Sequence, residues 1–168
     1  MACIGRKYSA HRASEAYPCR VIRSERPVAA PAAIVHTVLT DVTAWKLWAP
    51  HVASVDCVVD VIRDTAWSGL VKPWLGPAVQ MDVTWVEPGR GMRWTTTVLG
   101  HRIDYTDTIT PDGDDRCLVT MTAEVSGVVG SLVSTAVGPI SGFGQRRRLA
   151  RLGTLAEYLH RRAIVFAA

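Results

Sequence analysis

The chain has 168 residues, of which 48% are hydrophobic and 20% are charged, a balance typical of a single soluble domain with its own core. The net charge of +4 lies at the two ends, in residues 1–26 and 145–162, and the intervening segment is mildly acidic. This distribution argues against a broad nucleic-acid-binding face. No apolar run approaches the roughly 18 residues of a membrane span, and the polar N-terminus lacks the apolar segment of a secretory signal peptide. We therefore expect a cytoplasmic protein without integral membrane association.

Residues 1–18 are expected to form a flexible extension, and residues 19–164 a single domain. The four cysteines form no CxxC pair, so neither a disulfide framework nor a zinc site is indicated. Cys57 and Cys117 fall in the apolar phase of predicted strands, where free cysteine behaves as a small hydrophobe. We expect no metal and no cofactor.

The first elements are a strand and two short helices. Residues 20–28 alternate loosely and predict an edge strand, because Pro27 cannot donate a hydrogen bond to a neighbour. Pro31 is suited to the first turn of a helix over residues 31–40. Asp41 is a candidate N-cap for a short helix over residues 42–48, which ends before Pro50.

From Val52 the apolar residues recur at every second position, which is typical of strands with one buried face. The predicted strands cover residues 52–61, 67–75, 79–85, 92–98, 103–109 and 117–125. Turn sequences separate them, among them Glu87-Pro88-Gly89, Gly100-His101 and Pro111-Asp112-Gly113. Short connections between successive strands predict an antiparallel meander, and the chain as a whole is α+β.

Residues 128–162 predict a long C-terminal helix. One apolar stripe recurs at spacings of three and four, formed by Leu149, Leu152, Leu155, Ala156 and Leu159. The arginines of this segment, including Arg146–Arg148, are expected on its outer side. Gly138-Pro139 interrupts the first half, and proline within a helix removes a hydrogen bond and clashes with the preceding turn. We expect a kink or short break there, which would let Val128–Val137 and Phe143 act as a gate for an apolar ligand.

Several segments resemble the START-like, or polyketide cyclase/dehydrase and lipid-transport (SRPBCC), superfamily over residues 20–162. The resemblance is carried by the segment Pro31-Ala32-Ala33-Ile34-Val35 with Trp45 and Trp48, by Val86-Glu87-Pro88-Gly89-Arg90, by Pro111-Asp112-Gly113 and by Gly127 before the last helix. It implies a helix-grip fold, in which a seven-stranded antiparallel sheet curls around a long C-terminal helix. It also implies an elongated cavity between helix and sheet.

The strand phases predict which side chains face that cavity. A tight turn at Gly100-His101 would pair Val98 with Ile103, Thr96 with Tyr105 and Trp94 with Asp107. In the next hairpin, Tyr105 would lie near Ala123 and Asp107 near Met121. The candidate ligand-binding residues are Trp67, Trp74, Met81, Val83, Trp85, Trp94, Thr96, Tyr105, Met121, Val133 and Phe143.

Asp107 and Tyr105 are the candidate catalytic residues. A carboxylate among tryptophan and methionine side chains has its pKa raised by desolvation and can act as an acid or base. A structural role is the alternative for both, since buried ion pairs also perturb pKa values and a buried tyrosine usually has a backbone partner.

Three functions fit these features. The first is the binding of a hydrophobic small molecule, such as a lipid, a polyketide or an aromatic compound, by a monomer or homodimer. The second is a polyketide cyclase/aromatase or dehydratase acting on a bound poly-keto chain. The third is a protein-interaction domain. Catalysis would require two polar groups that converge on one substrate atom, and Asp107 with Tyr105 is the one plausible pair.

Overall fold

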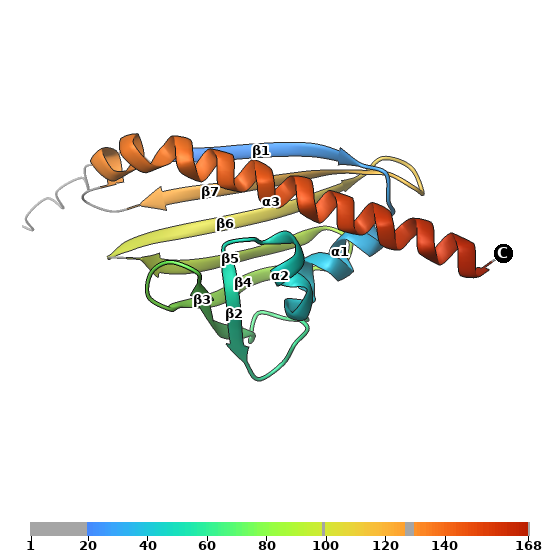
Figure 1. Ribbon diagram of the computed structural model, residues 1–168, viewed down its shortest axis with the longest axis horizontal. Coiled ribbons are helices and arrows are strands. Elements are labelled where there is room, and N and C mark those ends of the chain that lie inside the picture. The colour runs from blue at the N-terminus through green and yellow to red at the C-terminus, as the bar shows by residue number, and fades with distance from the viewer. Residues whose placement is uncertain (1–19, 99, 127–129, 168) are drawn as a thin grey trace, which may run out of the picture.

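The computed structural model describes residues 20–98, 100–126 and 130–167, with the backbone alone for residues 20, 130–142, 166 and 167. Seven strands form one antiparallel sheet in the order β1-β7-β6-β5-β4-β3-β2. The long helix α3 crosses one face of this sheet, and α1 and α2 lie on the same face (Figure 1). The strands are β1 (Arg20–Val28), β2 (Val52–Cys57), β3 (Ser68–Pro73), β4 (Val79–Glu87), β5 (Gly91–Val98), β6 (His101–Pro111) and β7 (Cys117–Ser126). The helices are α1 (Ala32–Thr40), the 3₁₀ turn η1 (Val42–Ala44), α2 (Trp45–Trp48) and α3 (Gly130–Ala167). The predicted α+β helix-grip class is confirmed.

The turn between α1 and α2 is held by the predicted cap. The Asp41 carboxylate accepts hydrogen bonds from the Thr43 backbone N–H at 2.9 Å and from its hydroxyl at 2.6 Å. These bonds satisfy a backbone donor that a helix start leaves free. The indole of Trp45 then donates to the Leu39 carbonyl at 2.9 Å. Together they direct α2 toward the sheet, with Trp45 and Trp48 buried.

β2 is shorter than the predicted strand over residues 52–61. It ends at Cys57, and Val58 and Val59 are exposed. The chain leaves the sheet there because its next backbone groups bond to the end of α1: the Asp60 carbonyl accepts from Val42 N–H, and Ile62 N–H donates to Thr40. Alternating apolar residues in the sequence do not show whether the backbone of a segment bonds to a neighbouring strand or to a neighbouring helix.

The register between β5 and β6 differs by two residues from the prediction. Val98 pairs with His101, and Trp94 pairs with Tyr105 rather than with Asp107. Gly100 has φ of 79°, which suits glycine in a tight hairpin. A shift of two residues keeps every side chain on its face, so the inward set survives. The predicted pairs of β6 and β7 that join Tyr105 to Ala123 and Asp107 to Met121 are confirmed.

A register irregularity in β4 changes the direction of one tryptophan. Val83 pairs with Trp94, but Trp85 pairs with Arg93, so an extra residue lies between them. Beyond such a bulge the side-chain phase inverts. Val86, opposite the buried Met92, packs against the core in place of Trp85. The predicted inward direction of Trp85 is therefore wrong.

The helix α3 packs through the predicted stripe. Leu149, Leu152 and Ala156 are buried, whereas Leu159 is exposed, and the C-terminal end of α3 extends beyond the sheet (Figure 1). Gly153 lies against β1, where a Cβ would be 3.1 Å from the Arg26 guanidinium. Arg26 in turn pairs with Glu157 at 3.3 Å.

The expected break at Gly138-Pro139 is absent, since the helical backbone is continuous from Gly130 to Ala167. Pro139 removes one backbone donor, and the turns on both sides keep their helical geometry. The side chains of residues 130–142, which include most of the proposed gate and Val133, lie outside the described residues. Phe143 is exposed at 68% of its surface.

Candidate functional site

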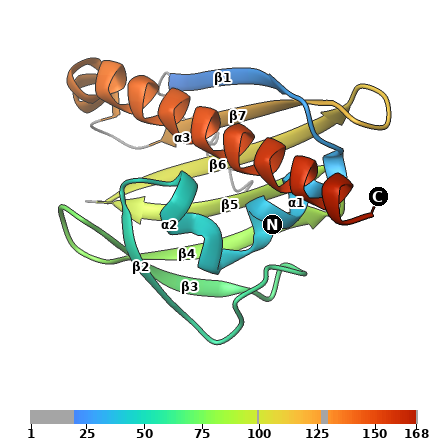
Figure 2. The same cartoon turned by 45° about the vertical axis from the view of Figure 1, so that its right-hand side comes forward.

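A cavity of about 380 Å³ lies between α2, α3 and the inner face of the sheet. Its volume falls within the range of small-molecule sites, about 300–1,000 Å³. Figure 2 shows α2 and α3 above β4, β5 and β6, the strands that supply most of the floor. The cavity is lined by Trp45, Trp48, Ala49, His51, Val52, Val71, Pro73, Leu75, Gly76, Pro77, Val79, Met81, Met92, Trp94, Thr96, Val98, Tyr105 and Arg148.

Strand alternation positions the floor of the cavity. Met81 is buried opposite Thr96, and both project inward from β4 and β5. The Thr96 hydroxyl donates to the Gln80 carbonyl at 2.7 Å, so its polar atom has a protein partner and its methyl group is left for packing. The floor is consequently apolar.

Two stacked rings form one wall. The rings of Trp94 and Tyr105 lie 3.9 Å apart between centroids with 11° between their planes, as expected for cross-strand neighbours on one face. Burial is the main cause that raises the pKa of Tyr105, so its phenol is protonated at neutral pH and can donate a hydrogen bond.

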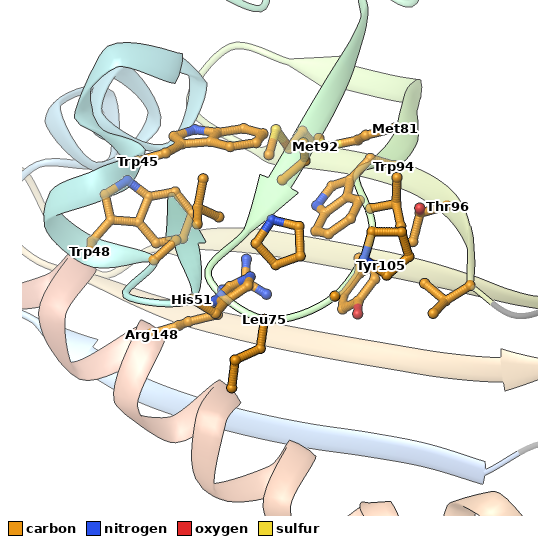
Figure 3. A pocket seen from close by; sticks show the side chains of 18 residues that line it. Trp45, Trp48, His51, Leu75, Met81, Met92, Trp94, Thr96, Tyr105 and Arg148 are labelled. Carbon is orange, nitrogen blue, oxygen red and sulfur yellow. The ribbon is translucent and has the colours of Figure 1, made fainter. Parts of the chain in front are cut away.

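Arg148 is the charged residue of the cavity. It is 8% exposed and lies over three rings, 5.4 Å from the centroid of Trp48 and 5.9 Å from those of Trp94 and Tyr105. Figure 3 shows its side chain entering from α3, with Trp48 on one side and Trp94 and Tyr105 on the other. The expectation that all of Arg146–Arg148 face outward is wrong. Arg148 lies four residues before Leu152 and adjoins Leu149, so helical spacing places it on the buried face.

His51 lies at the rim. The residue is exposed, but its partial burial beside the cavity, followed by the charge of Arg148, lowers its pKa to about 4. The Trp74 backbone N–H donates to the His51 carbonyl at 3.0 Å, which joins the rim residue to the loop between β3 and β4. At neutral pH the rim therefore carries a neutral imidazole next to a guanidinium.

Asp107 lies behind the wall rather than at the cavity surface. It is 1% exposed, and its carboxylate accepts a hydrogen bond from the Trp94 indole at 3.4 Å. Burial raises the pKa of Asp107 above its ordinary value, and the weaker effects of Arg148 and Trp94 oppose that rise. No ion pair joins Asp107 to Arg148 within the described part of the chain.

The structure brings some of the predicted site residues to the cavity and places others elsewhere. Those that line it are Met81, Trp94, Thr96 and Tyr105. Trp67, Val83 and Met121 are packed in the core, and Trp67 donates to the Val59 carbonyl at 2.7 Å. Trp74 is 73% exposed and does not line the cavity, whereas its neighbours Pro73 and Leu75 do.

Several lining residues are absent from the predicted site. They come from α2 and the residues after it, from the β3–β4 loop, from α3, and from strand positions such as Val71, Val79, Met92 and Val98. Trp45 and Trp48, which carry part of the family resemblance, are both core residues and part of the cavity wall. For Arg148 a usable signal existed, namely its place in the apolar spacing of the last helix. His51 and Leu75 carried no signal, because loop residues have no periodicity from which a direction follows.

The described part of the chain contains neither a metal centre nor a membrane-spanning helix. Within residues 20–98, 100–126 and 130–167, no three His, Cys, Asp or Glu side chains come together as ligands. Over the same described residues, no helix combines the length and hydrophobicity that crossing a bilayer requires.

Comparison with known proteins places the chain in a family. Residues 20–157 match the family model described as polyketide cyclase / dehydrase and lipid transport. The protein belongs to this family, as its resemblance to the START-like (SRPBCC) superfamily implied. No curated protein matches the sequence significantly.

Solved structures share the fold at low sequence identity. A hypothetical protein from Helicobacter pylori is 14% identical with a TM-score of 0.71, over 82% of this chain and 88% of that one. The ZhuI aromatase/cyclase from Streptomyces sp. R1128 is 15% identical with a TM-score of 0.66, over 83% and 94%. A START superfamily protein from Mycobacterium smegmatis is 16% identical with a TM-score of 0.60, over 80% and 98%. At these identities the likeness concerns the fold alone.

Proposed function

We propose that the protein binds a hydrophobic small molecule in the cavity between α2, α3 and the sheet. The observation that carries the proposal is the cavity itself, about 380 Å³ in volume and lined mainly by aromatic and aliphatic side chains. Protein interiors are close-packed, so a core with a purely structural role does not contain a void of this size. An apolar cavity with a few polar groups is the usual form of a ligand site. Membership of a family that includes lipid transport supports the same function.

The loop between β3 and β4 is proposed as the entrance. Leu75 is 92% exposed and yet contributes to the lining, together with Gly76 and Pro77. An exposed leucine at the rim of an apolar cavity gives an apolar ligand a first contact before it is buried. Trp74, a predicted ligand-binding residue in the same segment, is exposed and does not line the cavity.

Catalysis by Asp107 and Tyr105 is less well supported. The phenol of Tyr105 belongs to the lining, but the carboxyl of Asp107 is bonded to the Trp94 indole behind it. An acid or base has to lie within hydrogen-bond reach of the substrate atom on which it acts. Binding therefore accounts for the geometry better than cyclisation or dehydration does.

The test is a pair of cavity-filling variants with a neutral probe. Val79 and Val98 line the cavity and are only half-buried, so Val79→Phe and Val98→Phe should fill space without disrupting the core. We expect the wild type to bind N-phenyl-1-naphthylamine saturably with enhanced fluorescence, and each variant to bind it about tenfold more weakly.

Val21→Phe is the matched control, since Val21 is exposed on β1 away from the cavity. The same change of side chain should leave its affinity at the wild-type value. Absence of saturable binding, or equal affinity in all four proteins, would rule out the cavity as the site. If the wild type binds the probe and the two cavity variants bind it more weakly, native mass spectrometry of protein from its own host should identify a co-purified ligand.

A further inference from the structure

Arg148 has a charge that the described protein leaves without a counter-ion. It is more than nine-tenths buried. Its Nε–H, which is out of reach of solvent, has no hydrogen-bond acceptor among the described residues. Burial of a charged group without partners is costly, and native proteins place such groups in pairs or bind an ion there. A guanidinium has five donors in one plane, so several are available for an incoming ligand.

The aromatic rings around Arg148 do not fill this role. Trp48, Trp94 and Tyr105 have their ring centroids within 6 Å of the guanidinium carbon, a distance at which a cation is attracted to a ring face. Ring faces offset part of the lost hydration, but they offer no oxygen acceptor. They also limit the directions that the guanidinium can take, which prepares it for a planar, bidentate acceptor.

Asp107 does not fill it either. Asp107 is 1% exposed, its carboxyl accepts a hydrogen bond from the Trp94 indole, and none of the ion pairs among the described residues joins it to Arg148. Trp94 contacts both groups, one at its indole N–H and the other at its ring. Asp107 thus lies behind the cavity wall, whereas the guanidinium of Arg148 is part of the cavity lining.

We infer that Arg148 binds the carboxylate of an amphipathic ligand whose apolar body fills the rest of the cavity. This inference rests on the proposed function and names the class of ligand for the same site. The chemistry follows from the two halves of the lining: apolar side chains such as Val71, Met81 and Met92 on one side, and one buried guanidinium on the other. A carboxylate matches the guanidinium in shape and charge, and Arg forms two parallel hydrogen bonds with it.

The experiment compares carboxylates with alcohols of the same carbon skeleton. Two pairs separate an aromatic body from an alkyl one: 2-naphthoate with 2-naphthalenemethanol, and decanoate with 1-decanol. Dissociation constants are measured by calorimetry at neutral pH. A charge-assisted bond to a buried group predicts that the wild type prefers the carboxylate in at least one pair by about 10- to 100-fold.

The variants assign that preference to one side chain. Arg148→Met keeps the unbranched stem and removes the charge, so it should bind carboxylate and alcohol with equal affinity while retaining the affinity for the alcohol. Arg148→Lys keeps a charge without the planar fork and should retain only part of the preference. Arg147→Met is the control: Arg147 is the exposed neighbour outside the cavity, and its loss should leave the preference intact.

Three results would overturn the inference or the proposal beneath it. If the wild type binds carboxylate and alcohol equally and still binds N-phenyl-1-naphthylamine, the inference of a carboxylate ligand is refuted, whereas the proposed apolar binding site stands. A preference that survives in Arg148→Met assigns it to another group. Failure of every compound, the neutral probe included, removes the cavity as a binding site. Should Arg148→Met not fold, the ratio in Arg148→Lys against wild type decides the same question.

Discussion

Replacing Asp107 by asparagine should make the protein more stable at neutral pH. The carboxyl of Asp107 is 1% exposed and has one described hydrogen-bond donor, the Trp94 indole at 3.4 Å. Asparagine has nearly the same shape, and its amide oxygen can accept the same bond. The substitution therefore removes the ionisable proton and changes little else.

The magnitude follows from linkage between protonation and folding. Burial holds the pKa of Asp107 above the ordinary value of 3.8, although the charge of Arg148 and the Trp94 bond act in the opposite direction. The folded protein thus keeps this proton at pH values where the unfolded chain has lost it. The stability that Asp107 contributes is complete below pH 3.8 and is lost as the pH rises through the folded pKa. The limiting slope is about 1.4 kcal/mol per pH unit.

Guanidinium chloride unfolding, followed by tryptophan fluorescence between about pH 4 and pH 8, measures this difference. As the pH increases, the free energy of unfolding of Asp107→Asn should rise relative to that of the wild type, at most with the limiting slope, until the folded carboxyl ionises. Asp104→Asn is the control with the opposite sign, because the hydrogen bond from Arg102 lowers the pKa of Asp104. Asp104 contributes stability above its unfolded pKa and loses it as the pH falls through the folded pKa.

A gap between wild type and Asp107→Asn that stays constant across this range would refute the reasoning. It would mean that the folded carboxyl ionises normally and has a counter-ion in the core. Arg148 is the candidate, because its charge already acts to lower the pKa of Asp107. The same result would therefore argue against its role in binding an external carboxylate.

Two further predictions concern the backbone and the rim. Gly91→Ala should destabilise the protein by more than about 3 kcal/mol in chemical unfolding, because a Cβ there would be 2.0 Å from the Asp107 carbonyl oxygen at φ of 130°. Gly89→Ala, at φ of 71° with open space, should cost only about 1–2 kcal/mol, and equal costs would contradict the model of close approach. His51 should titrate near pH 4 in NMR spectra, and Arg148→Met should raise its pKa in part, since burial is the larger cause. Titration near 6.5 in the wild type would show that the imidazole lies free in solvent.

Much of the fold could be predicted because its local signals agree with one another. Alternation in the strands, the Asp41 cap and the glycine-containing turns each act within a few residues, so they are legible in the sequence. The inward direction of Met81, Trp94, Thr96 and Tyr105 depends only on strand phase. It survived the error of two residues in the β5–β6 register, since a side-chain period of two restores the same face.

The tertiary structure decided the features that phase does not encode. The extra residue between Val83 and Trp85 turns one tryptophan away from the cavity, and only the pairing with β5 reveals it. Loop residues such as Leu75 take their direction from the elements that they join. The position of Arg148 was only partly predictable. Helical spacing places it on the apolar stripe, but an arginine is expected to remain in water. Its burial became visible only once α3 lay across the sheet and three rings from distant segments surrounded the guanidinium.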